Sequence, residues 1–130
     1  MTIVVRHVDR LCFQVSAGEH TVSVDAGVND GGTGSALSAP QLFAAAVGAC
    51  MCEFVVNSCR LREIPLESLS LEVTYEELTR PRRIGGLETT LHIEPEPSED
   101  VKQRLLGVAR RATLVNTLMR PPEVRVEFAT

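Results

Sequence analysis

The sequence predicts a single α+β domain over residues 1–130, built from antiparallel strands packed around long apolar helices. A chain of 130 residues is long enough for one ordinary core and too short for two. Its alternating segments come in pairs joined by short turns, and the longest apolar run, residues 39–62, has the length of a helix. Strands that pair as hairpins beside long helices indicate antiparallel sheets. The expected element order is βββ-α-ββ-α-β.

Three short segments with alternating apolar and polar residues open the chain, at 2–8, 11–15 and 20–25. This alternation predicts three strands, the last two joined as a hairpin through residues 16–19. The next segment, 25–38, contains four glycines and predicts a mobile loop without a regular element. No Lys-Ser/Thr pair follows these glycines, so a nucleotide-binding loop is not expected.

The apolar run 39–62 predicts a helix that is buried on nearly all sides. Ser38 is a suitable N-cap, Pro40 fits the first turn, and Pro65 prevents continuation. Polar residues at 53, 57 and 60 interrupt the run too early for a membrane span. Because one small domain can hardly cover such a helix, a homodimer is expected.

The remaining segments predict a second hairpin, a second helix and a last strand. Residues 69–78 and 87–93 alternate and are joined by a turn at 79–86. Ser98 is the expected N-cap of an amphipathic helix, and 113–119 is a candidate for a further helical turn. The apolar face of the helix that follows Ser98 is formed by Val101, Leu105, Val108 and Ala112. Residues 124–128 predict the last strand.

Charge and cysteine usage exclude several classes of partner. The net charge of −4 and the lack of a basic cluster argue against nucleic acid, and no signal peptide is recognisable. A cytoplasmic location with free thiols is therefore expected. Cys50 and Cys52 lie on roughly opposite sides of a helix, and no other ligand spacing is present, so no metal and no cofactor is expected.

The chemistry of the chain depends on Cys50, in the middle of the apolar helix. A thiol among apolar groups is normally inert, because burial disfavours the thiolate. No basic residue lies within one helical turn of Cys50. Reactivity would need an arginine from elsewhere in the fold or from a partner subunit. The spacing is compatible with two interpretations of Cys50, an inert core cysteine and a reactive thiol.

Two motifs resemble the OsmC/Ohr family of osmotically inducible and organic hydroperoxide resistance proteins. Residues 41–50, QLFAAAVGAC, resemble the family's helix start ending in Gly-Ala-Cys. Residues 112–118, ATLVNTL, followed by 120–124, RPPEV, resemble its second-cysteine segment. The resemblance covers nearly the whole chain. It implies an intertwined homodimer in which antiparallel sheets wrap two long central helices.

The resemblance also implies a chemistry. In active members a first cysteine attacks a hydroperoxide, a second cysteine forms a disulfide with it, and an external dithiol reduces that disulfide. An arginine and a glutamate activate the first thiol. Here the first position is Cys50, but Ala112 stands where the second cysteine belongs. Pro40 and Gln41 stand where the glutamate belongs, so Gln41 is the candidate for that position.

The activating arginine is not assigned by the sequence. The loop 25–38 contains none, which leaves a set of candidates elsewhere: Arg6, Arg10, Arg80, Arg82 and Arg83. Three functions remain open. The chain is a one-cysteine hydroperoxide reductase, a non-peroxidatic relative that binds a small apolar or thiol-reactive ligand in the dimer cleft, or a protein whose Cys50 is only a core residue.

Overall fold

The computed structural model describes all 130 residues, and the chain forms two compact units. The first unit comprises residues 1–45 and 75–86, and the second comprises residues 46–74 and 87–130. Helix α1 and the hairpin of β4 and β5 contribute residues to both units. Each unit is described by itself below.

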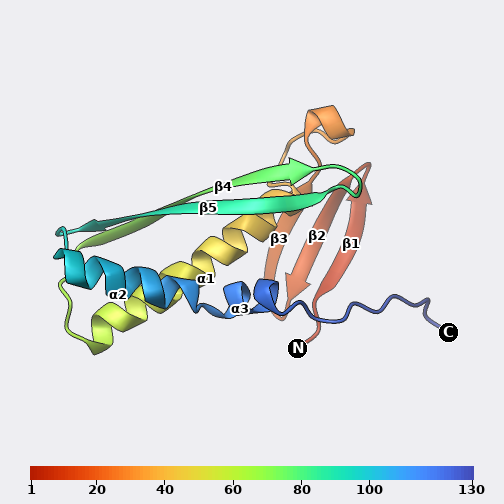
Figure 1. Ribbon diagram of the computed structural model, residues 1–130. Helices are drawn as coiled ribbons and strands as arrows, with labels where there is room; N and C mark the ends of the chain where they lie inside the picture. The colour runs from red at the N-terminus through yellow and green to blue at the C-terminus, as the bar shows by residue number, and fades with distance from the viewer. The chain divides into compact units, whose positions relative to one another are not determined.

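The first unit contains an antiparallel sheet of β1 (Val4–Asp9), β2 (Cys12–Ala17) and β3 (His20–Asp25), as Figure 1 shows. Phe13 pairs with Val24, and Val15 pairs with both Val5 and Val22. Gly18, with φ +62°, forms the tight turn between β2 and β3, where the left-handed region favours glycine. The three strands predicted from the alternation are confirmed, with shifts of one or two residues at their ends.

The segment after β3 is more ordered than the sequence predicts. It contains a short 3₁₀ helix, η1 (Val28–Asp30), although no regular element is expected there. Backbone bonds hold it: Gly34 N–H donates to the Ala26 carbonyl, and Asp25 N–H donates to the Leu37 carbonyl. The glycines allow the chain to fold back on itself, which composition alone does not reveal.

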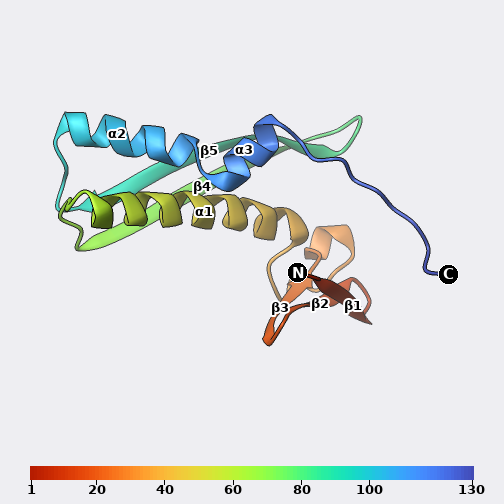
Figure 2. The same cartoon turned by 90° about the horizontal axis from the view of Figure 1, so that it is seen from below.

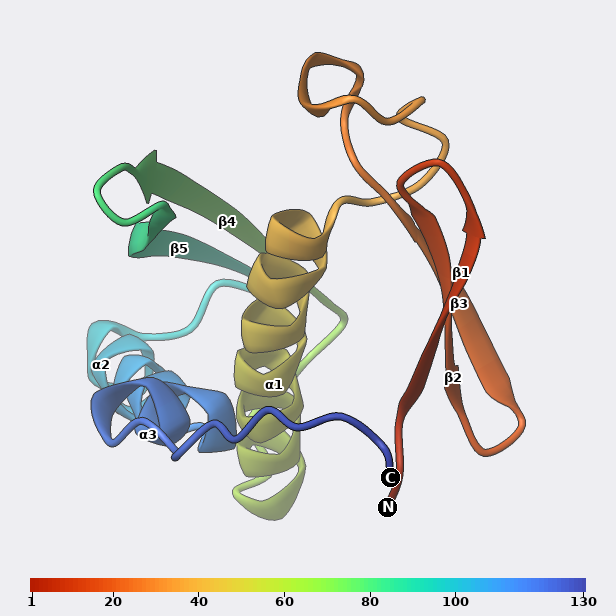
Figure 3. The same ribbon diagram turned by 90° about the vertical axis from the view of Figure 1, so that its right-hand side faces the viewer.

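The core of the second unit lies between α1 (Ala39–Leu61), α2 (Glu99–Arg110) and the strands β4 and β5. Figure 2 shows α1 and α2 side by side, and Figure 3 shows α2 and the hairpin on the same side of α1. Val55 and Cys59 from α1 pack against Leu105 and Ala109 from α2. Within the single chain only one face of α1 has such partners, so the predicted burial on nearly all sides depends on the expected second copy and stays a prediction.

Strands β4 (Ser68–Leu78) and β5 (Arg83–Glu94) form the second hairpin, and β5 begins earlier than predicted. Along β4 the residues alternate between half-buried and exposed, as expected for a strand with one packed face. Gly48 lets α1 approach this hairpin closely, because a Cβ there would lie 2.8 Å from Val73 Cγ2. A larger residue at position 48 would push the helix away from the strand.

Helix α2 begins as predicted, and α3 (Thr113–Met119) follows it after a short break. The Val101 N–H donates to Ser98 Oγ, so Ser98 is the N-cap. The strand predicted at 124–128 is absent: residues 121–130 have no regular structure and are exposed. A strand needs a neighbouring strand to satisfy its backbone groups, and this segment pairs with neither of the two sheets.

Helix α1 is long and apolar enough to cross a membrane by length and composition. Core helices pass the same test, so this property is weak evidence of a span. In this structure one face of α1 contributes to the core described above.

Candidate functional site

Cys50 lies on the side of α1 that points away from the core. It is five residues before Val55, which places the two side chains about 140° apart around the helix. Its helical neighbours Ala46, Glu53 and Asn57 are exposed, while Cys50 itself is half-buried. The thiol is therefore bordered by the uncovered face of the helix rather than enclosed in the core of the second unit.

The other three cysteines occupy different surroundings. Cys59 is buried in the core, and Cys52 is half-buried; burial raises the pKa of both thiols. A raised pKa keeps a thiol protonated and hence weakly nucleophilic. Cys12 lies on β2, opposite Asp25 in the register, and all four cysteines are free.

Ala112 is fully buried and forms the N-cap position of α3. Its carbonyl accepts from the Asn116 N–H at 3.0 Å, and the Asn116 amide donates to the Arg111 carbonyl at 3.2 Å. Thr117 Oγ1 donates to the Thr113 carbonyl. These residues of the second motif fix the corner between α2 and α3. A methyl group thus fills the place where the resemblance expects a second thiol.

Gln41 caps the start of α1. Its Oε1 accepts from the Ser38 N–H at 2.9 Å, and its own N–H donates to Ser38 Oγ at 3.3 Å. This reciprocal pair is a capping box, and the spacing Ser-x-x-Gln carries its signal in the sequence. Nine residues along the helix separate Gln41 from Cys50, about 14 Å. The Gln41 oxygen is used for capping, and the structure does not bring the two predicted site residues into contact.

Among the candidate arginines, Arg82 has carboxylate partners in the first unit. Its Nη2 lies 3.4 Å from Glu77 Oε2 and 3.5 Å from Asp30 Oδ1. A small cavity of about 230 Å³ adjoins this cluster, lined by Pro40, Glu77, Arg82, Arg83 and Ile84. Pro40 is one of the two positions where the resemblance places the glutamate. The sequence could not select Arg82, because its partners come from η1 and β4.

The other candidate arginines are placed differently. Arg83 Nη1 donates to the carbonyls of Thr79 and Pro81, so it stabilises the turn before β5. Arg6 is an exposed residue of β1, and Arg80 lies in the same turn as Pro81, with φ +62°. Arg10 accepts a hydrogen bond from the His7 ring at its backbone carbonyl. The structure shows no carboxylate partner for these four side chains.

Asp25 is a buried carboxylate that the sequence reading did not single out. Its Oδ2 accepts from the hydroxyl and backbone N–H of Thr33 and of Ser35. The Thr33 hydroxyl, followed by the backbone and hydroxyl of Ser35, holds the pKa of Asp25 well below its usual range. The residue is 1% exposed, so it anchors the segment before α1 rather than meeting solvent.

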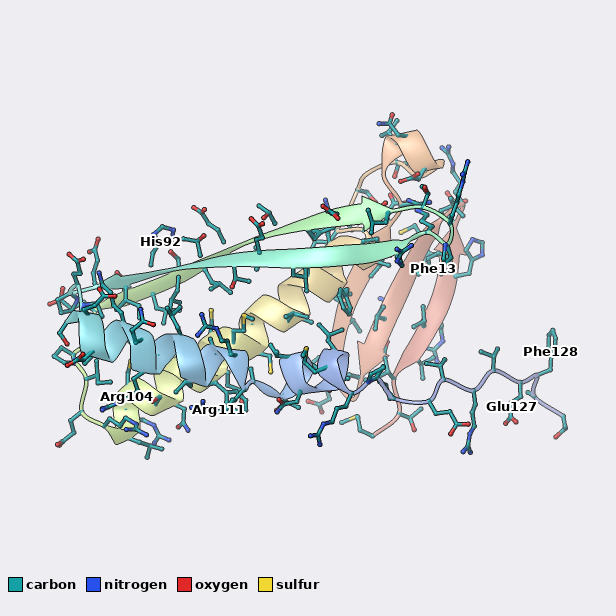
Figure 4. All side chains as sticks on the ribbon, in the orientation of Figure 1. Phe13, His92, Arg104, Arg111, Glu127 and Phe128 are labelled. Atoms are coloured by element: carbon teal, nitrogen blue, oxygen red, sulfur yellow. The ribbon has the colours of Figure 1, made fainter.

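A groove of the second unit lies between β5 and α2 and has a volume of about 600 Å³. Its wall includes the ion pair of Lys102 and Glu96, 2.6 Å apart, and the apolar Leu106. His92 also borders it and lies 3.6 Å from Glu72; Figure 4 shows His92 on the outer side of the hairpin. Cys50 does not line this groove, which is therefore separate from the thiol.

Comparisons with known proteins agree with this arrangement of elements. A family model described as OsmC-like protein matches residues 32–127. A solved structure from Psychrobacter arcticus, named for osmotic stress induction and detoxification response, has a TM-score of 0.85 at 21% identity, covering 90% of this chain and 87% of that one. No curated protein matches the chain.

Two further solved structures are similar. An OsmC-like protein of Mycoplasma pneumoniae has a TM-score of 0.79 at 16% identity, covering 91% of this chain and 86% of that one. An organic hydroperoxide resistance protein, OsmC, of Legionella pneumophila has a TM-score of 0.68 at 22% identity, covering 91% and 89%. At these identities the likeness shows the fold, an α+β fold with antiparallel strands, and the family model covers well over half of the sequence. The chain therefore belongs to the OsmC-like protein family.

Proposed function

We propose that this protein reduces organic hydroperoxides through one cysteine, Cys50, in defence against oxidative stress. The observation that supports this best is the position of Cys50. It occupies the place of the first cysteine in the motif, is half-buried, and borders the uncovered face of α1. Relatives of the same fold include a protein named for organic hydroperoxide resistance.

The proposed reaction follows thiol chemistry. The Cys50 thiolate attacks the outer peroxide oxygen, the O–O bond breaks, and the alkoxide leaves as an alcohol after taking a proton. Cys50 becomes a sulfenic acid, oxidised by two electrons. With a buried alanine at 112, the disulfide expected at that position cannot form. One thiol of an external dithiol then condenses with the sulfenic acid and releases water, and its second thiol frees Cys50 as a disulfide forms in the reductant.

A homodimer is part of the same proposal. Exposed apolar side chains remain on α1, among them Phe43 and Val56, and the C-terminal segment 121–130 has no partner in the chain. Both features are expected when a second copy completes the fold. We also place the protein in the cytoplasm, because a dithiol reductant requires a reducing compartment.

Trapping of the sulfenic acid tests the function. The purified protein is mixed with one equivalent of cumene hydroperoxide and with dimedone, and its intact mass is recorded. We expect one dimedone adduct per chain in the wild type and none in Cys50→Ser. Cys52→Ser is the matched control, because Cys52 lies on the same helix and burial raises its pKa. This variant should keep the adduct.

An unmodified Cys50, under conditions that oxidise an established thiol peroxidase completely, would contradict the proposal. The non-peroxidatic alternative would then be favoured, and a thermal shift with apolar or thiol-reactive compounds would test it. An adduct that persists in Cys50→Ser would show that another cysteine reacts.

A further inference from the structure

We propose that the outer face of α2 binds a phosphate group at Gly107, among the side chains of Arg104, Arg110 and Arg111. Binding at this site does not depend on the proposed chemistry of Cys50, because Gly107 lies on another helix. It gives a role to a group of arginines that the proposed reaction does not use.

The first observation is the uneven distribution of charge in the second unit. Residues 101–120, which form most of α2 and all of α3, contain five basic residues and no acidic one. Of the five, only Lys102 has an ion-pair partner, Glu96. The other four are exposed arginines: Arg104, Arg110, Arg111 and Arg120. Cations gathered on one segment create a positive potential that attracts anions.

Three of these arginines surround one glycine. On a helix surface, the nearest neighbours of a residue are those three and four positions away, with Cβ atoms about 5–6 Å apart. For Gly107 these neighbours are Gln103, Arg104, Arg110 and Arg111. Gly107 lies about 160° around the helix from the core residue Leu105, so the ring is on the outer face. Figure 4 shows Arg104 and Arg111 on the same side of α2.

The position at the centre of this ring is open. A Cβ built on Gly107 would lie 3.5 Å from Arg111 Nη1 and 3.8 Å from Arg111 Nη2. Apart from the two chain neighbours of Gly107, no other side chain comes within 4 Å of that Cβ. The Arg111 guanidinium therefore lies back over the helix at Gly107. Packing within the chain does not require glycine here, although glycine weakens a helix relative to alanine. The bare backbone leaves room for a ligand.

The three guanidiniums are free to bind an anion. Each carries five N–H donors, and no hydrogen bond or ion pair within the chain engages the side chains of Arg104, Arg110 or Arg111. The hydrogen bond from the Asn116 amide to Arg111 uses the backbone carbonyl of Arg111. Asp100, the carboxylate one turn before Arg104, forms no ion pair. The ring therefore presents positive charge that no group of the chain neutralises.

This arrangement favours a compact anion with several oxygens. Arginine binds phosphate through two parallel N–H···O bonds, and clusters of arginines recognise phosphate groups. The open position is one side chain wide, which suits a tetrahedral group better than an extended acidic peptide. The phosphate group can belong to a small compound or to a phosphorylated residue of a partner protein, since both present the same oxygens.

Isothermal titration at about 20 mM salt, where screening is weak, tests the site with two probes. Pyrophosphate represents a small phosphorylated compound, and an otherwise neutral phosphoserine peptide represents a phosphorylated protein. We expect saturable binding, and the probe that binds more tightly identifies the source. Arg104→Gln and Arg111→Gln should each weaken binding about tenfold, because each removes charge-assisted hydrogen bonds. Arg120→Gln, the matched control, removes the same charge outside the ring and should leave the affinity nearly unchanged.

Gly107→Leu distinguishes a defined site from a general attraction of anions. This variant keeps every charge of the protein but fills the open position, so we expect saturable binding to be lost. Leucine is a better helix former than glycine, so the variant should stay folded, and circular dichroism checks this. Cys50→Ser should bind the probe as the wild type does.

Three results would overturn the proposal. The first is the absence of saturable binding of both probes to the wild type. The second is equal affinity in Gly107→Leu and the wild type, or an equal loss in Arg120→Gln and Arg111→Gln. The third comes from hexaglutamate, titrated under the same conditions. If hexaglutamate binds more tightly than both phosphate probes through the same arginines, the ligand is an acidic peptide and the phosphate assignment is wrong.

Discussion

At the scale of single residues, Asp25 shows how one carboxylate can organise a glycine-rich segment. Four donors from Thr33 and Ser35 converge on one oxygen, Oδ2, and they come from residues eight and ten positions later. Two of these donors are the backbone N–H groups of Thr33 and Ser35, which lie outside any helix or strand and have no carbonyl partner there. The carboxylate replaces the ladder of hydrogen bonds that a helix or strand would supply.

Asp25 should make the stability of the protein fall in acid. Its pKa is lowered in the folded state, while the unfolded chain takes up the proton near pH 4. Its contribution is therefore complete above about pH 4 and is lost as the pH falls further. Asp25→Asn should lower the melting temperature by several degrees at pH 7, and its difference from the wild type should shrink towards pH 3.

Thermal scans between pH 7 and pH 3 measure this difference. Asp9→Asn, at an exposed position of β1, is the control and should change the melting temperature little. A constant difference between Asp25→Asn and the wild type at every pH would contradict the linkage.

Asp25 also shows which site residues cannot be predicted from the sequence. Ser38 and Ser98 could be predicted as caps, because their partners lie three residues away and the pattern is local. Cys50 could be located by its motif. Asp25 and Arg82 could not be selected, since Thr33, Ser35 and Asp30 reach them through folded loops that no local pattern encodes.

At the scale of elements, hydrophobic periodicity predicted five of the strands and both long helices within a few residues. It predicted α1 as apolar on nearly all sides, but an apolar sequence does not tell whether the cover of each face comes from the same chain or from a second copy. It also predicted a last strand at 124–128, where the alternation is real but no neighbouring edge is present. Periodicity therefore identifies faces, while the partner of each face depends on tertiary and quaternary structure.

Helix α2 depends on Leu105 for its packing. This side chain is 1% exposed and contacts Val55 and Cys59 of α1 in the core of the second unit. Leu105→Ala should lower the free energy of unfolding by about 2–5 kcal/mol, since it removes buried apolar surface and leaves a cavity. Urea unfolding followed by circular dichroism measures the loss.

The neighbouring residue provides the matched control for this substitution. Leu106 is half-buried and lines the groove between β5 and α2. Leu106→Ala should therefore cost clearly less than Leu105→Ala. Equal losses for the two variants would show that the core does not centre on Leu105.

At the scale of the whole molecule, the C-terminal segment is the part of the chain on which the proposed dimer can be tested most directly. Val124, Val126 and Phe128 alternate with Arg125 and Glu127, a pattern typical of a strand with one apolar face. All three apolar side chains are more than 80% exposed, and Figure 4 shows Glu127 and Phe128 on the extended tail beyond α3. Such a segment is expected to pair with a sheet edge, and we assign that edge to the proposed second copy.

The strength of the dimer should therefore depend on the apolar face of this segment. Burying one such side chain contributes about 1.5–3 kcal/mol, so the double variant Val126→Ser/Phe128→Ser should weaken dimerisation about tenfold or more. Sedimentation velocity over a range of concentrations measures the dissociation constant. Arg125→Ser/Glu127→Ser alters the other face of the same strand and should leave the constant nearly unchanged. If the wild type sediments as a monomer at micromolar concentration, the homodimer is rejected. If the Val126→Ser/Phe128→Ser variant keeps the dissociation constant of the wild type and only its stability falls, the segment folds onto its own chain.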